Sequence, residues 1–135
     1  MALLDPFSAA LARVDGAAAV ALAADLVRIP RHPGVDHQEE AVARAMARWL
    51  EARGLAPRLD EAAPGRPNLL CTVAGPRPGR RLILCGHTDT VPLNAGGAGF
   101  GFSGEVVDGW LRGRGAVDMK GPLAAMAAAL VALYG

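Results

Sequence analysis

Apolar positions recur every three to four residues in three segments of the chain, residues 5–29, 36–53 and 122–134. This is the period of an amphipathic helix, and we predict a helix in each segment. Pro30 ends the first helix, because the residue before a proline is displaced from helical backbone angles. Gly54 ends the second as a C-terminal cap. The buried face of the last helix is predicted to consist of Leu123, Met126, Ala127, Leu130, Val131 and Tyr134.

Local signals refine the first two helices. Gly16 is expected to interrupt the first, because glycine is a poor helix former. Asp36 and Glu39 are three residues apart, which is the spacing of a capping box. Their side chains are therefore expected to satisfy free N–H groups at the start of the second helix.

The pattern between the second and last helices favours strands. Residues 57–61 form a weak candidate and residues 68–74 a stronger one. The strongest candidate is 81–86, which contains the continuous apolar run Leu82 to Cys85. A continuous run, rather than alternation, is typical of a strand that is covered on both faces.

Asp108-Gly109 lies between two short strand-like runs, residues 105–107 and 110–112, and this arrangement predicts a hairpin.

Strands placed between helices predict an α/β fold. We expect one mixed sheet flanked by helices, with a helix on each face. The length of 135 residues suffices for one domain that spans residues 1–135.

Composition narrows the function. The formal net charge is +1 and aromatic residues make up 4%, so neither nucleic acid nor an anionic membrane surface is an expected partner. The N-terminal region lacks the basic start of a secretory signal, and no uncharged apolar stretch has the length of a membrane span.

Cys71 and Cys85 lie in strand-like segments, as expected for buried free thiols in a cytoplasmic protein. A disulfide between neighbouring strands is the alternative.

The first candidate site directly follows the strongest strand. In open α/β sheets, ligands bind beyond the carboxyl ends of the strands, which is where His87 lies. His87 and Asp89 project to the same side if the extended conformation continues. An aspartate beside a metal-binding histidine can accept the other ring N–H and fix the tautomer. Alternatively, His87 caps the end of the strand and bonds nearby backbone.

The second candidate site is the glycine-rich turn at residues 113–122, which contains Asp118 just before the last helix. Glycines at 113 and 115 permit close approach of the backbone or a positive φ. Asp118 could simply cap the helix. Taken together with His87 and Asp89, however, it indicates a hard, oxygen-rich metal site.

Two segments carry a resemblance to a known family. Residues 84–92 read LCGHTDTVP, and residues 108–121 read DGWLRGRGAVDMKG. In this order and at this separation they resemble the zinc-dependent family of aminoacylases, acetylornithine deacetylases, succinyl-diaminopimelate desuccinylases and glutamate carboxypeptidases. The resemblance covers most of the chain and implies that it is the N-terminal portion of a di-zinc peptidase-like catalytic domain.

The resemblance also implies roles for individual residues. His87 matches a ligand of one metal ion, Asp89 matches the catalytic-site aspartate that orients this histidine, and Asp118 matches a carboxylate that bridges two metal ions. A cis peptide bond between Asp118 and Met119 is implied as well. The implied cofactor is Zn²⁺, two per complete site, with Co²⁺ or Mn²⁺ as alternatives. The implied substrates are N-acyl amino acids or small peptides, whose amide bond is hydrolysed. A full-length relative is expected to be a homodimer.

The chain departs from the family pattern after the second motif. Family members carry a Glu-Glu pair, further metal ligands and a lid or dimerisation domain, whereas residues 119–135 contain no Asp, Glu or His. The chain thus resembles about the first third of a family member. We expect a partial metallohydrolase catalytic domain that is inactive as an isolated chain. The alternative is a small non-enzymatic α/β interaction or regulatory fragment that keeps the motifs as structure.

Overall fold

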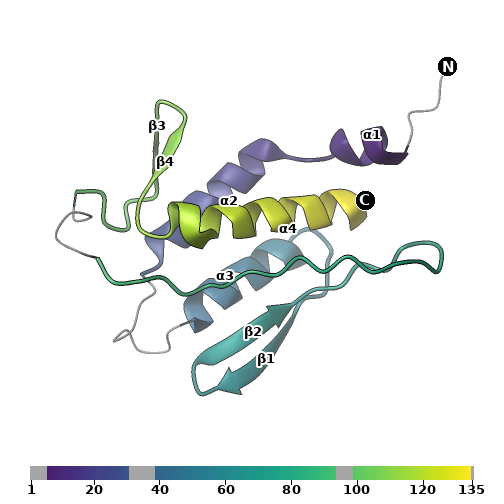
Figure 1. The fold of residues 1–135 in the computed structure, drawn as a ribbon, viewed down its shortest axis with the longest axis horizontal. Helices are drawn as coiled ribbons and strands as arrows, with labels where there is room; N and C mark the ends of the chain where they lie inside the picture. Colours follow the sequence, from purple (N-terminus) through teal and green to yellow (C-terminus); the bar gives the residue numbers. More distant parts are fainter. Residues whose placement is uncertain (1–5, 31–38, 94–98, 135) are drawn as a thin grey trace.

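The computed structural model describes residues 6–30, 39–93 and 99–134 (Figure 1). The helices in these ranges are α1 (Pro6–Leu11), α2 (Gly16–Arg28), α3 (Glu40–Glu51) and α4 (Gly121–Tyr134). The strands are β1 (Arg58–Ala63), β2 (Arg66–Leu70), β3 (Glu105–Val107) and β4 (Trp110–Arg112). A kinked turn, Ala116–Lys120, in which Asp118 and Met119 have non-helical backbone angles, leads directly into α4.

The first predicted helix is divided in two near the expected interruption. Helix α1 ends at Leu11, and α2 begins at Gly16. The Asp15 carboxylate caps α2 by accepting a hydrogen bond of 2.8 Å from the Ala18 N–H. The expected end is confirmed, because Ile29 is the C-cap of α2 in extended conformation.

The second predicted helix is α3, but it does not begin with the expected capping box. Asp36 lies outside the described residues. Glu39 is the N-cap residue and its side chain makes no capping hydrogen bond. Its carboxylate instead accepts two hydrogen bonds, of 2.9 and 3.0 Å, from the Arg66 guanidinium on β2. The end of the helix is as predicted, with Gly54 in the left-handed region at φ 83°.

Helices α2, α3 and α4 enclose the core. Leu26 and Val42 are fully buried in this core. Helix α4 lies alongside α2 (Figure 1) and contributes mainly small residues: Leu123, Ala124, Ala127, Ala128 and Ala132. The predicted apolar face of α4 is therefore only partly correct. Small side chains allow two helix axes to approach closely, whereas the larger Met126, Leu130 and Val131 flank the contact half-buried.

Among the described helical segments, Ala116–Tyr134 is the one that is long and apolar enough to cross a membrane. Of the apolar stretch in this segment, 33% is buried inside the protein. The segment also includes the buried charge of Lys120. Its buried residues include four alanines of α4, the helix that packs against α2.

The α/β class is confirmed, but within the described residues the sheets are small and antiparallel instead of one mixed sheet. Strand β1 pairs with β2, and β3 pairs with β4 around the predicted Asp108-Gly109 turn. Residues 81–86, the strongest strand candidate, are extended but belong to neither sheet. Leu82 and Ile83 are 79% and 82% exposed, so the prediction of a strand covered on both faces is wrong here. An extended segment becomes a strand only beside a partner that takes up its backbone hydrogen bonds.

Both cysteines are free thiols, as predicted, and the alternative of a disulfide between them is wrong. Cys71 is half-buried against the core. Cys85 is exposed, contrary to the expectation of burial, because it lies in the unpaired extended segment.

Candidate metal site

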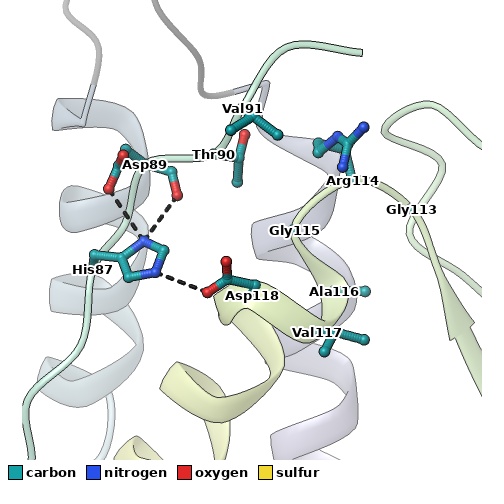
Figure 2. Close-up of a pocket in the computed structure, with 10 residues that line it drawn as sticks. All are labelled: His87, Asp89, Thr90, Val91, Gly113, Arg114, Gly115, Ala116, Val117 and Asp118. Carbon is teal, nitrogen blue, oxygen red and sulfur yellow. Dashed lines mark hydrogen bonds and ion pairs between the residues drawn. The ribbon is translucent and has the colours of Figure 1, made fainter. Parts of the chain in front are cut away.

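Two segments that are distant in sequence meet at the start of α4. One is the extended chain that carries His87, and the other is the kinked turn Ala116–Lys120 that carries Asp118. Figure 2 shows the His87 ring pointing at the Asp118 carboxylate, with 2.9 Å between Nε2 and Oδ1. The predicted convergence of these residues across 31 positions is confirmed. The predicted location at the carboxyl end of a sheet is wrong for the described residues, since no sheet contains residues 81–86.

Asp89 holds the other side of the histidine ring. His87 Nδ1 lies 3.1 Å from the backbone oxygen of Asp89 and 3.1 Å from its carboxylate Oδ1. Both atoms are acceptors, so they favour a proton on Nδ1. This arrangement leaves Nε2, the nitrogen that faces Asp118, as the one able to bind a metal ion.

The surroundings of His87 favour its charged form. Partial desolvation lowers the pKa of the ring, but the hydrogen bond to Asp118 and the interactions with Asp89 outweigh it and raise the pKa above its ordinary value. An imidazolium can donate from both nitrogens, whereas a neutral ring can donate from only one. The raised pKa means that the ring keeps its second proton, and with it a donor for Asp118, up to a higher pH than an isolated histidine does.

Glycines allow the Asp118 turn to approach its neighbours closely. Gly113 has φ 138°, and a Cβ there would lie 2.4 Å from Val27 Cγ1 on α2. Gly115 has φ 81°, and a Cβ there would lie 2.5 Å from Thr90 Cγ2. Real Cβ atoms do not approach so closely, so these positions require glycine. The turn is thereby packed against both α2 and the segment that carries His87.

Met119 adds a contact that the sequence did not predict. The Asp118–Met119 peptide bond is cis, as the family resemblance implies. The Met119 thioether sulfur accepts a hydrogen bond of 3.4 Å from the backbone N–H of His87. Asp118 and Met119 therefore contact the same histidine, one through its ring and the other through its backbone. Apolar periodicity gives no signal for such a contact, because Met119 precedes the regular part of α4.

A cavity of ≈ 410 Å³ opens in front of these groups. His87, Asp89 and Asp118 line it together with the backbone of the glycine-rich turn (Figure 2). The side chains are accessible, with His87 44% and Asp118 82% exposed. A ligand in this cavity would thus reach both the imidazole and the carboxylate.

The donor set fits part of a zinc site. Zinc binds histidine nitrogen and carboxylate oxygen at about 2.0–2.2 Å, which places two tetrahedral ligands about 3.4 Å apart. The observed Nε2 to Oδ1 separation of 2.9 Å is a hydrogen-bond distance, so the two atoms would have to move apart by about 0.5 Å to bind one zinc ion together. In the described part of the chain, however, no group of three or more His, Cys, Asp or Glu residues is arranged to hold a metal ion. A catalytic zinc site uses three protein ligands, so these residues provide a portion of one.

Comparison with known proteins agrees with the two motifs. The model of peptidase family M20/M25/M40 matches residues 83–134, which include His87, Asp89 and Asp118. The chain is also similar to curated relatives named succinyl-diaminopimelate desuccinylase. It is 41% identical over 115 residues to that of Cereibacter sphaeroides, with 83% of this chain and 29% of the relative covered.

Further relatives give the same result. The chain is 39% identical over 120 residues to the desuccinylase of Methylobacterium radiotolerans, with 85% of the chain and 29% of the relative covered. It is 40% identical over 118 residues to that of Granulibacter bethesdensis, with coverages of 84% and 29%. The chain therefore spans under a third of the length of these relatives. The resemblance stated from the motifs is confirmed for this N-terminal part.

Proposed function

From the confirmed resemblance of this chain to the N-terminal part of peptidase family M20/M25/M40 proteins, we propose that it forms part of the catalytic site of a metal-dependent hydrolase. The reaction is hydrolysis of the amide bond of an N-acyl amino acid or small peptide. The observation that carries the proposal is the contact of 2.9 Å between His87 Nε2 and Asp118 Oδ1, with Asp89 behind the ring.

Each of the three residues has a distinct role in this proposal. His87 and Asp118 hold the metal, which is Zn²⁺ with Co²⁺ or Mn²⁺ as alternatives. Asp89 keeps the proton on Nδ1 and so presents the Nε2 lone pair. When bound, such a metal supplies Lewis-acid activation of the amide carbonyl and of a water molecule. The Asp118 side chain is 82% exposed, which leaves room beside it for a second metal ion, as bridging would require.

The names of the relatives suggest the substrate class. They are called desuccinylases of succinyl-diaminopimelate, and we propose an N-succinyl amino acid as the first substrate to test. A cytoplasmic location and a homodimeric full-length relative stay predictions.

We further propose that the isolated chain does not turn over substrate. Residues 119–135 contain no Asp, Glu or His, so they supply neither a general base nor additional ligands. General acid–base catalysis contributes roughly 10²–10⁴-fold. Hydrolysis of an N-succinyl amino acid by the purified chain with zinc should therefore equal a zinc-only blank.

Zinc titration calorimetry tests the metal site directly. The wild-type chain should bind about one equivalent, with less than the roughly 10 kcal/mol of a complete structural zinc site. His87→Ala and Asp118→Asn should abolish this binding. Asp108→Asn is the matched control, because Asp108 is an exposed carboxylate at the tip of the β3–β4 hairpin. Binding that survives His87→Ala and Asp118→Asn would refute the assigned site, and metal-dependent turnover by the chain would refute its proposed inactivity.

A further inference from the structure

Lys120 is a fully buried charge close to the candidate site. It is the only lysine in the sequence, and its relative exposure is 0%. Its Nζ donates a hydrogen bond of 2.7 Å to the backbone oxygen of Ile29 and lies 5.9 Å from the centre of the Phe102 ring. Burying an ammonium group is costly unless it is hydrogen-bonded, so a lysine at this position needs an explanation.

The hydrogen bond joins two elements that position the site. Ile29 is the C-cap of α2, where helix carbonyls lack intrahelical partners and the helix dipole is negative. Lys120 lies two residues after Asp118, and its backbone N–H donates to Gly115 O at 2.8 Å to close the turn. The ammonium thus links the end of α2 to the turn that carries Asp118.

The stem of Lys120 supports the same turn from inside. If Gly115 carried a Cβ, that atom would lie 3.4 Å from Lys120 Cδ. The same position of Gly115 also faces Thr90. Thr90 is itself buried and follows Asp89 in the segment of His87. A displacement of Lys120 would therefore be transmitted to both sides of the contact between His87 and Asp118.

We propose that Lys120 is a positioning residue, which holds the Asp118 carboxylate opposite His87 by fastening the turn to the C-terminal end of α2. Only its consequence for metal binding rests on the proposed function. The contact between His87 and Asp118 is a property of the metal-free chain and can be measured separately.

The test compares Lys120→Met with Val42→Ala. Methionine keeps an unbranched stem but cannot donate to Ile29 O. Val42 is fully buried in α3, so its truncation costs stability without touching the turn. Both variants are studied at a temperature at which circular dichroism shows them folded. Nitrogen-15 spectra of the histidine rings, with the His87 signals identified by their loss in His87→Ala, report the hydrogen bond to Asp118. Zinc calorimetry reports the affinity.

In Lys120→Met, the His87 ring signals should move toward those of Asp118→Asn, and zinc affinity should fall at least tenfold. In Val42→Ala, both should stay at wild-type values despite the loss of stability. Unchanged His87 signals in folded Lys120→Met would overturn the proposal, as would equal changes in Val42→Ala. If the wild-type chain binds no zinc, the proposed metal function fails, while the ring signals still decide the role of Lys120.

If Lys120→Met does not fold, the proposal can still be tested by a measurement on the protein that keeps Lys120. Lysine labelled at the side-chain nitrogen should give one ammonium signal with slow hydrogen exchange, and this signal should shift in Asp118→Asn. An exchange rate like that of a solvent-exposed lysine, or no shift in Asp118→Asn, would overturn the proposal.

Discussion

Gly115→Ala tests how the two halves of the candidate site are packed together. A Cβ at this position would lie 2.5 Å from Thr90 Cγ2, and the residue has φ 81°. The left-handed backbone alone costs an alanine about 1–2 kcal/mol. Forcing an extra methyl group into a packed contact adds about 1–3 kcal/mol. We therefore expect the free energy of unfolding to fall by about 2–5 kcal/mol.

Two comparisons separate the backbone cost from the steric cost. Gly109 has φ 79°, and no atom lies within 4 Å of the position that a Cβ would occupy, so Gly109→Ala carries the backbone cost without the clash. Thr90→Ser removes Cγ2, so Gly115→Ala should cost less in this background, by about 1–3 kcal/mol. Urea unfolding followed by tryptophan fluorescence measures all four variants. An equal loss in Gly115→Ala and Gly109→Ala, with no recovery in the Thr90→Ser background, would refute the packing argument.

Two more predictions concern titration and thiol chemistry. Asp118→Asn should lower the pKa of His87, as measured by NMR titration of the metal-free chain. Folding raises the pKa of His87, so the protonated ring stabilises the folded chain. This contribution to the free energy of unfolding is fully present below the unfolded-state pKa of about 6.5, and it is lost as the pH rises through the folded-state pKa. An unchanged pKa in Asp118→Asn would contradict the contact. Cys85 should react with a disulfide reagent before Cys71, because Cys85 is exposed while burial raises the pKa of the half-buried Cys71 thiol. Mass spectrometry of the singly modified chain identifies the site, and modification at Cys71 first would be the contrary result.

The helices and the hairpin could be predicted from the sequence because their signals are local. The helix ends at Pro30 and Gly54 and the Asp108-Gly109 turn depend on the backbone preferences of one or two residues. The candidate site was also predictable, since His87, Asp89 and Asp118 belong to two short motifs with a fixed order. Their convergence was expected at the carboxyl end of a sheet, whereas in the described residues the glycine-rich turn packs against α2 and the segment that carries His87.

Other features depended on contacts between segments that are distant in the sequence. The apolar run at 81–86 reads as a strand, but a strand needs a partner, and none of the described residues pairs with it. Glu39 fits a capping box, but the guanidinium of Arg66, 27 residues away, binds its carboxylate instead. Lys120 shows most clearly what tertiary structure decided. Its residue type gives no indication of burial, and it is the approach of the α2 C-terminus that brings the Ile29 carbonyl within hydrogen-bonding distance of the buried ammonium.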